Sequence, residues 1–437
     1  MTILLVLISI AILVLLIVWA KLNPFLAFLI SSITAGFLLG LPADKIASSV
    51  QNGMGHLLGD LVIVIVMGAM LGKLVAESGA AQRIAGVLMK VFGEKHITWA
   101  MSLTGLIVGI PLFYNVGFVL LVPLAFTVSY QYRISAVYVG IPLLAALSVT
   151  HGFLPPHPSP AALVAQFEAN MGLTLFYGFL ITIPTIIVAG PLFSTLLKKV
   201  KAEPLKTFQA ETRPEEELPG TTNSFFTALL PVVLLVGTTA LSLNTPEDSF
   251  FAPLISFVAN PGIVMIISVL VATYTIGLRM KFTMKHLMEL YTNATKDIAM
   301  ILLIVAGAGA LKQIFTDSGV SLTIAEGLKN WSLHPLILAW LITAIIRVCV
   351  GSATVAGLTT AGIIAPLVTT MNVDPNLLVL SIGAGSLMFS HFNDAGFWMY
   401  KEFFNVSIKD TIKTWSVMET LVAVMGLVGV LILDLFI

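Results

Sequence analysis

Long apolar segments separated by short polar ones recur from one end of the chain to the other. Many of them reach about 18 residues, the length at which a helix crosses roughly 30 Å of hydrocarbon. In the first half this pattern predicts helices near residues 2–20, 23–41, 59–77, 97–113, 115–130, 134–150 and 173–197. In the second half it predicts helices near residues 224–243, 260–278, 297–315, 334–350, 354–371, 376–390 and 412–435. We therefore expect an all-α integral membrane protein with about 12–14 membrane helices.

The two halves of the chain resemble each other at a separation of 240 positions. Glu77–Ser78–Gly79 returns as Asp317–Ser318–Gly319, and His151 returns as His391. An internal repeat in so apolar a chain is typical of secondary transporters. The repeat predicts a first membrane repeat at 1–197, a polar linker at 198–223 and a second membrane repeat at 224–437.

The basic residues predict how these segments are oriented. Lysines are frequent in the linker and recur near residues 279–285, and basic loops favour the cytoplasmic side. The segment 244–261 has no Lys or Arg, so we expect it to be external. An odd number of crossings in each half then makes the two repeats inverted relative to each other. The expected location is the inner cell membrane, with the linker in the cytoplasm.

Composition supports a lipid environment. The chain has 437 residues, of which 58% are hydrophobic and 10% are charged. A soluble domain carries roughly 25% charged residues, so this chain could not cover its surface with polar groups in water. The formal net charge of zero gives no reason to expect nucleic acid as a partner. The single cysteine, Cys349, excludes an internal disulfide, and its apolar surroundings predict a packed position.

Four interruptions of the apolar segments, at 109–117, 150–160, 351–357 and 390–396, predict broken or re-entrant helices. Broken helices are tolerated at membrane depth only where protein surrounds a cavity. The breaks at 109–117 and 351–357 lie at corresponding places in the two halves. A helix N-terminus offers unpaired N–H donors and about half a positive charge, which suits an anion. We predict a binding site at Tyr114, Asn115, Ser352 and Thr354; the alternative is that Gly and Pro only kink packed helices.

The interruption at 150–160 contains four prolines, which predict a rigid non-helical segment holding His151 and His157. No Cys, Asp or Glu lies nearby to complete a metal site, so we expect neither a metal nor a cofactor. An imidazole that titrates near neutral pH fits substrate hydrogen bonding or proton coupling. A purely structural role for these histidines is the alternative.

The interruption at 390–396 places His391, Asn393 and Asp394 close together in sequence. Intramembrane carboxylates are costly and usually functional, so His151, His391 and Asp394 are the predicted proton-coupling residues. Arg347 lies near a predicted helix end, where it could pair with a carboxylate or extend to the membrane surface; we favour the surface position.

With these residues identified, the chain resembles the gluconate:proton symporter (gluconate permease) family over nearly its whole length. The resemblance rests on His151-Gly-Phe-Leu-Pro-Pro-His157-Pro, Pro111-Leu-Phe-Tyr114-Asn115 and Ser390-His391-Phe-Asn393-Asp394. Ser159 stands where the family more often has glycine or alanine. The family's place in the ion transporter superfamily implies inverted repeats and paired re-entrant hairpins. It also implies sugar acids or related hydroxy acids as substrates, or D-serine in some members, and it extends the predicted substrate site to His151, His157, Ser159 and Asn393.

These observations favour a secondary carrier that imports a sugar acid with protons across the lipid bilayer. Sodium coupling is the nearest alternative, and a homo-oligomer is compatible with either. An intramembrane enzyme would need paired aspartates or a His-Glu-x-x-His string, which the sequence lacks. A respiratory proton-pumping subunit would place lysines and glutamates in mid-helix, whereas the ionisable residues here are expected at breaks and loops. No Gly-Lys-Ser/Thr loop for ATP occurs.

Overall fold

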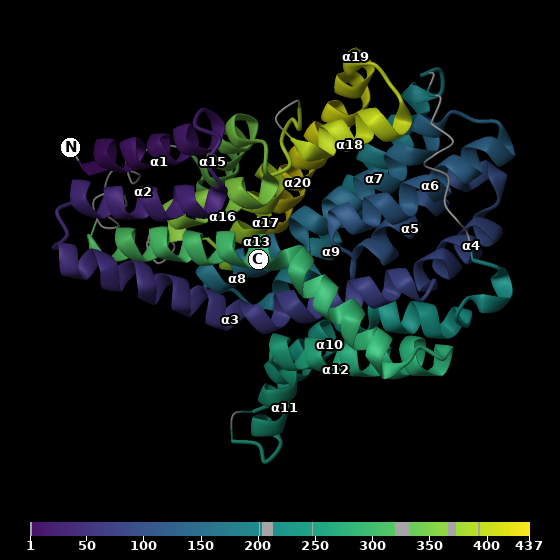
Figure 1. Ribbon diagram of the computed structural model, residues 1–437, viewed down its shortest axis with the longest axis horizontal. Helices are drawn as coiled ribbons and strands as arrows, with labels where there is room; N and C mark the ends of the chain where they lie inside the picture. The colour runs from purple at the N-terminus through teal and green to yellow at the C-terminus, as the bar shows by residue number, and fades with distance from the viewer. Residues whose placement is uncertain are drawn as a thin grey trace.

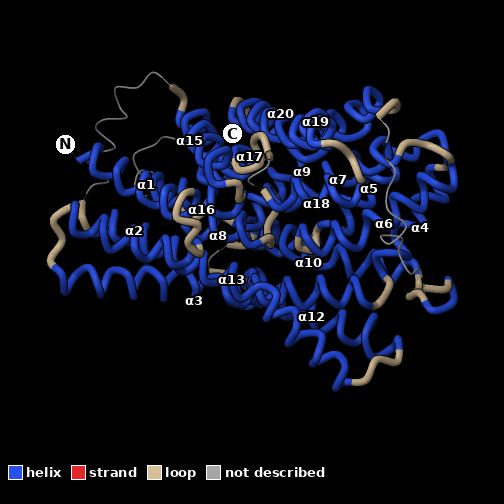
Figure 2. The backbone as a smooth tube through the Cα atoms, turned by 45° about the horizontal axis from the view of Figure 1, so that its top comes forward, coloured by secondary structure: helices blue, strands red, loops and turns tan. Residues whose placement is uncertain are grey.

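The computed structural model describes residues 2–200, 202, 213–246, 248–319, 333–365, 373–391 and 394–437, and this part of the chain is helical and contains no strand (Figures 1 and 2). The first half contains α1 (Thr2–Val18), α2 (Pro24–Leu38), α3 (Ala43–Glu77), α4 (Ala80–Phe92), α5 (Ile97–Gly109), α6 (Tyr114–Tyr132), α7 (Ala136–Phe153), α8 (Pro158–Gln166) and α9 (Met171–Ile187). The second half contains α10 (Thr221–Asn244), α11 (Ala252–Ala259), α12 (Pro261–Ala272), α13 (Met284–Asp317), α15 (Pro335–Val350), α16 (Ala353–Ile364), α17 (Pro375–Gly385), α18 (Ala395–Phe404), α19 (Ile408–Thr411) and α20 (Val417–Asp434). The predicted all-α class is confirmed.

Helix length and surface chemistry identify a multi-pass membrane protein. Among the described residues, seven helical segments are long and apolar enough to cross a bilayer, and six shorter apolar helices of 10–17 residues accompany them. Large apolar side chains such as Phe37, Val233 and Leu270 remain more than half exposed. Exposed apolar surface on this scale is stable in lipid rather than in water. The number of crossings stays a prediction.

The helices α3 and α13 are the longest in the described chain, with 35 and 34 residues, and they lie side by side (Figure 1). Small residues allow this close packing: a Cβ on Gly53 would lie 2.3 Å from the backbone oxygen of Gly309. The Ser49 hydroxyl also donates to the Asp317 carboxylate at 2.5 Å. Both helices begin well before the predicted positions, because their first turns are largely exposed and bury only single apolar residues such as Ile46 and Leu287, so they contain no long apolar run.

The predicted interruptions separate consecutive helices. The backbone leaves the helix at Ile110–Phe113 between α5 and α6, and at Gly351–Ser352 between α15 and α16. It does so again at Leu154–His157 between α7 and α8, and between α17 and α18. The prediction that His151 lies in a non-helical segment is wrong. His151 is in the last turn of α7, which ends at Phe153, and the prolines interrupt the helix only after that residue. The order of elements is consistent with two repeats, and their inversion stays a prediction.

The short helices α4, α8, α11, α18 and α19 were not predicted, because none has an apolar run of membrane-spanning length. Helix α4 buries one face through Ala81, Ile84 and Leu88. Its polar face binds the end of the linker, where Arg83 and Lys90 both contact the Glu215 carboxylate at 3.0 Å. These cations lower the pKa of the exposed Glu215 carboxyl, with Lys90 making the larger contribution. The linker is therefore attached to the first half of the protein by charge.

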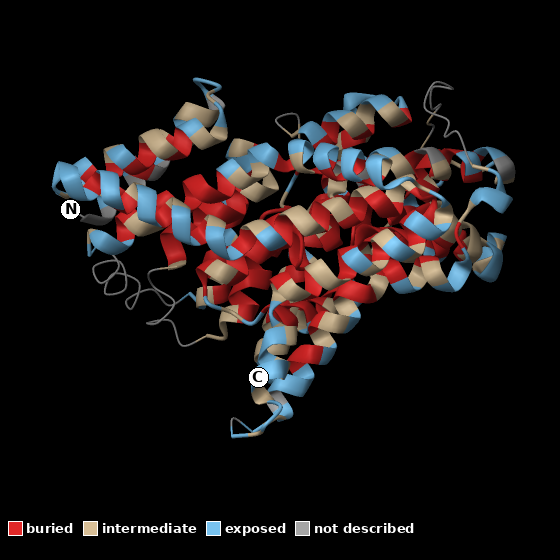
Figure 3. Cartoon of the chain, turned by 60° about the horizontal axis from the view of Figure 1, so that its bottom comes forward, coloured by how far each residue is buried: buried red, intermediate tan, exposed pale blue. Residues whose placement is uncertain are grey.

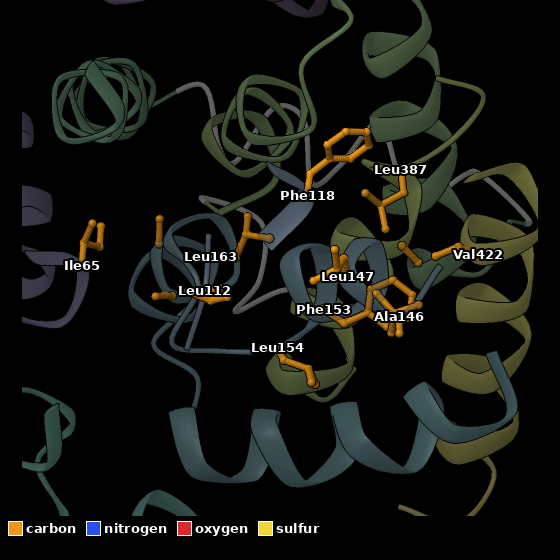
Figure 4. Close-up of a cluster of buried hydrophobic side chains, with 14 of the residues drawn as sticks. Ile65, Leu112, Phe118, Ala146, Leu147, Phe153, Leu154, Leu163, Leu387 and Val422 are labelled. Atoms are coloured by element: carbon orange, nitrogen blue, oxygen red, sulfur yellow. The ribbon is translucent and has the colours of Figure 1, made fainter. Parts of the chain in front are cut away.

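The core lies along the middle of the molecule (Figure 3), and α7 and α17 cross within it. Almost every side chain of α7 is buried. The helices approach closely at glycine, since a Cβ on Gly383 would lie 2.4 Å from the oxygen of Gly152. Around this crossing Leu147 and Phe153 gather with Leu387 and Val422 (Figure 4). The exposed position of Cys349 contradicts the prediction that it is packed in the core, because it lies on the outer side of α15.

Candidate functional site

A cavity of about 420 Å³ lies where the first and second halves of the chain bring two helix breaks together. The α5–α6 break contributes Phe113 and Tyr114, and the α15–α16 break contributes residues 350–354. Helices α7 and α13, the start of α18 and the region from Trp415 to Glu419 complete the walls. The volume lies within the range of roughly 300–1,000 Å³ that is usual for small-molecule sites.

The cavity brings together five of the residues predicted for the site: Tyr114, His151, Ser352, Thr354 and Asp394. They come from four separate parts of the sequence, so their convergence is a property of the fold. The side chain of Asn115 and the whole of Asn393 lie outside the described residues. His157, Ser159 and His391 do not line this cavity.

The N-terminus of α16 forms one wall of the cavity. Ser352 is its N-cap residue, and the Ser352 hydroxyl accepts a hydrogen bond from the Val355 N–H at 3.3 Å. Gly351 adopts φ 82°, a left-handed conformation that glycine tolerates and that turns the chain sharply between the helices. This geometry presents the first peptide donors of α16 and the Thr354 side chain to the cavity, as an anion requires.

A buried ion pair lies beside this helix N-terminus. Arg347 Nη2 contacts Asp394 Oδ2 at 2.5 Å, and the two side chains are 4% and 17% exposed. The guanidinium also donates to the Gly351 carbonyl. The preference for a surface position of Arg347 is therefore wrong. A buried guanidinium is costly without a partner, and Asp394 supplies that partner from 47 positions away.

Asp394 organises a second set of contacts on its own side of the cavity. Its Oδ1 accepts from the Gly396 N–H at 3.0 Å and so caps α18. Its Oδ2 also accepts from the Ser390 hydroxyl, which in turn accepts from Trp415 Nε1 at 2.7 Å. Both carboxylate oxygens thus accept hydrogen bonds. The network fixes the non-helical approach to α18.

Aromatic rings form the opposite wall. The Tyr114 ring lies 5.9 Å from the His151 ring and 6.1 Å from the Trp415 ring, measured between centroids. His151 Nδ1 is buried and makes no hydrogen bond in the described part of the protein. An unpaired polar atom at a cavity wall is positioned to bond a ligand hydroxyl or carboxylate.

The remaining predicted residues lie behind the cavity wall. His157 caps α8, and its Nε2 bonds the Gly109 carbonyl at 2.9 Å, with its ring 5.5 Å from that of His151. Ser159 is buried beside Gly357 of α16. His391 Nε2 bonds the Val348 carbonyl at 2.9 Å. His157 and His391 thus tie broken backbone segments to neighbouring helices.

The polar residues Ser148 and Glu419 also line the cavity, and neither was predicted from the sequence. Glu419 is 2% exposed and lies in the first turn of α20, and its Oε1 accepts from the Ser148 hydroxyl. The expectation that ionisable residues lie only at breaks and loops is therefore wrong for Glu419. The available signal was a carboxylate inside the apolar segment 412–435, whose other carboxylate, Asp434, lies at its far end.

Comparison with known proteins gives full-length matches. The family model described as GntP family permease matches residues 1–436. The chain is 45% identical over 438 residues to the high-affinity gluconate transporter of Escherichia coli, covering 100% of both chains. It is 45% identical over 427 residues to the Gnt-II system L-idonate transporter of the same organism, covering 98% of this chain and 97% of the relative. The gluconate permease of Bacillus subtilis is 44% identical over 451 residues, with 100% of both chains covered.

Two solved structures share the fold. The YdaH transporter of Alcanivorax borkumensis superposes with a TM-score of 0.68 at 16% identity, covering 94% of this chain and 98% of that one. MtrF of Neisseria gonorrhoeae superposes with a TM-score of 0.67 at 15% identity, covering 94% of each chain. At such low identity the likeness concerns the fold alone.

Proposed function

We propose that this chain, which belongs to the GntP permease family, imports gluconate or a closely related sugar acid together with a proton. Membership of the family makes the protein a permease rather than an enzyme. Several of its full-length relatives are named as gluconate transporters or permeases, and one is named as an L-idonate transporter. Gluconate and L-idonate are both six-carbon sugar acids, so one carboxylate and several hydroxyls define the substrate class.

The observation that carries the proposal is the convergence of two helix breaks on one polar cavity. The substrate carboxylate binds at the N-terminus of α16, near Ser352 and Thr354, where peptide donors and the helix dipole favour a negative charge. The N-terminus of α16 is the source of this attraction, because the nearby Arg347 guanidinium is paired with Asp394. The substrate hydroxyls face Tyr114 and His151 across the cavity.

The residues that the sequence suggested for proton binding differ in their hydrogen bonds and in their distance from the cavity. His391 and His157 each bond a backbone carbonyl outside the cavity, which favours a structural role. Asp394 is paired with Arg347 and serves to position that cation. Of these candidates, His151 alone combines a place at the cavity wall with an unbonded ring nitrogen among the described residues.

The orientation of the chain belongs to the same proposal. The basic linker lies in the cytoplasm of a cell with the protein in its inner membrane, and the two repeats are inverted relative to each other. The charged contacts of Arg83 and Lys90 with Glu215 support a position of α4 at the same membrane face as the linker.

Uptake by the purified protein in proteoliposomes tests the proposal. Labelled gluconate should accumulate when the outside is more acidic than the inside, in the absence of sodium, and a protonophore should abolish this accumulation. Unlabelled L-idonate should compete, and D-serine should compete far less. Accumulation that follows a sodium gradient and ignores the pH gradient would refute proton coupling, and the absence of any gluconate exchange would refute the substrate class.

A further inference from the structure

We infer that Glu419 is the group that binds the coupled proton, and that its protonation permits the sugar-acid anion to occupy the cavity. The inference rests on the proposed function, because it names the proton site of the same cavity. Glu419 was not among the residues predicted for the site. It is distinguished by its buried position at the cavity wall.

The Glu419 carboxyl is buried, and only one of its two oxygens is hydrogen-bonded in the described part of the protein. Its Oε1 accepts from the Ser148 hydroxyl, whereas Oε2 is buried and has no hydrogen-bond partner in the described part of the protein. No ion pair in that part of the chain includes Glu419. Ionising a carboxyl in such a place is costly, since neither water nor a cation stabilises the charge.

The cavity holds a cation, but that cation is already engaged. The Arg347 guanidinium contacts Asp394 at 2.5 Å and also donates to the Gly351 carbonyl. Of the two carboxyls at the cavity, Asp394 is paired with this cation, whereas Glu419 has no such partner and is the one that gains and loses a proton. His151 is less suited to this task, because a protonated imidazole donates from both ring nitrogens and the described part of the protein offers no acceptor to His151 Nδ1.

The ionisable groups around Glu419 belong to a small set. Tyr114, His151, Arg347 and Asp394 share the cavity with it from α6, α7, α15 and the start of α18. Lys413, on the π-helical turn Ile412–Ser416 before α20, is exposed. Helix α17 has no ionisable residue, and α9 has only Tyr177. At the far end of α20, Asp434 lies near His334.

Protonation of Glu419 changes the charge of the cavity by one unit. When Glu419 is ionised, the fixed charges of Arg347, Asp394 and Glu419 sum to one negative charge, which repels an anionic substrate. When Glu419 is protonated, that negative charge is removed and the anion binds. If binding requires the protonated form, the apparent affinity for gluconate falls up to tenfold for each pH unit above the midpoint of Glu419.

The test uses the full-length protein in proteoliposomes that contain a pH-sensitive dye. Gluconate counterflow reports binding and exchange, and dye fluorescence reports protons that enter with gluconate. Glu419→Gln should retain at least a tenth of wild-type counterflow, with an affinity that varies less than twofold between pH 6 and pH 8, and should lose more than nine-tenths of gluconate-coupled proton entry. Glu402→Gln, a change at an exposed carboxylate on α18, is the matched control and should behave as wild type.

The remaining outcomes separate this inference from the proposed function. Proton entry that persists in Glu419→Gln, or that is lost in His151→Gln alone, overturns the role of Glu419 while leaving symport intact. A wild-type protein that exchanges gluconate without proton entry, or that moves sodium instead, overturns symport and the Glu419 site together. If Glu419→Gln shows no counterflow, the Ser148→Ala variant tests the inference instead. This variant keeps the Glu419 carboxyl and removes the hydroxyl that donates to it. A shift of the pH midpoint of uptake to more alkaline values in Ser148→Ala supports the inference, and an unchanged midpoint overturns it.

Discussion

Removing the charge of Asp394 should destabilise the protein strongly, because it leaves Arg347 as an uncompensated buried cation. The Asp394→Asn side chain keeps an oxygen that can cap α18 at the Gly396 N–H, so the substitution changes the charge more than the shape. Arg347 is 4% exposed and Asp394 is 17% exposed, so water can replace little of the lost interaction. Breaking a buried ion pair by removing one partner costs about 3–5 kcal/mol.

The measurement is the free energy of unfolding in mild detergent, obtained by denaturant titration and followed by tryptophan fluorescence. Asp394→Asn and Arg347→Gln should each lose about 3–5 kcal/mol, and the double variant should lose less than the sum, with a coupling of about 1–3 kcal/mol. The exposed pair Lys401–Glu402, with a distance of 2.8 Å, supplies the control. Glu402→Gln should cost less than about 1 kcal/mol, because water screens an exposed pair.

If Asp394→Asn costs no more than Glu402→Gln, water solvates the Arg347 guanidinium from the cavity and the pair is not a buried one. A coupling near zero in the double variant would likewise show that the two residues act independently. Either result would show that the stability of the protein does not depend on pairing Arg347 with Asp394.

Three further predictions concern the substrate site, the packing of the breaks and the orientation of the linker. Thr354→Val should weaken gluconate affinity by about five- to hundredfold, the effect of one lost polar partner of 1–3 kcal/mol, whereas Thr360→Val on the same helix should leave affinity unchanged in a counterflow assay. Gly383→Ala should cost about 1–3 kcal/mol of unfolding free energy, since its Cβ would lie 2.4 Å from the Gly152 oxygen, whereas Gly237→Ala has open space and should be neutral or mildly stabilising. In a Cys349→Ser background, Glu216→Cys should react with an impermeant maleimide only from the cytoplasmic side, and Asp248→Cys only from outside; the reverse pattern would invert the assigned topology.

The sequence predicted the places where helices break better than it predicted how helices begin. Glycines, prolines and the correspondence at 240 positions marked the interruptions before Tyr114 and before Ala353, because these residues act on their own backbone. The extent of each break was overestimated, since α16 begins directly after Ser352. The first turns of α3 and α13 were missed because they are polar and bury only single apolar residues, Ile46 and Leu287 among them, so no apolar run marks them.

The candidate site was also predicted only in part, because the local sequence identifies residues beside helix breaks but not contacts between distant segments. Tyr114, Ser352 and Thr354 adjoin breaks, so local sequence identified them. The pairing of Arg347 with Asp394 is a tertiary contact, and the sequence near Arg347 is the same whether the side chain pairs or extends to the surface. Glu419 lies within a regular helix and next to no glycine or proline, so only its charge distinguished it.

The charges of the cavity give a physical reason for coupling an anion to a proton. Arg347 and Asp394 cancel each other, so the fixed attraction left for a carboxylate is the partial charge at the N-terminus of α16, roughly half a unit. Half a unit does not compensate a full negative charge in surroundings that also contain an ionised Glu419. A proton that enters with the anion leaves the total charge of the cavity unchanged between the empty and the loaded state. On the proposed function, the buried carboxyl therefore makes entry of the anion depend on entry of the proton, and an excess of protons outside drives the anion inward.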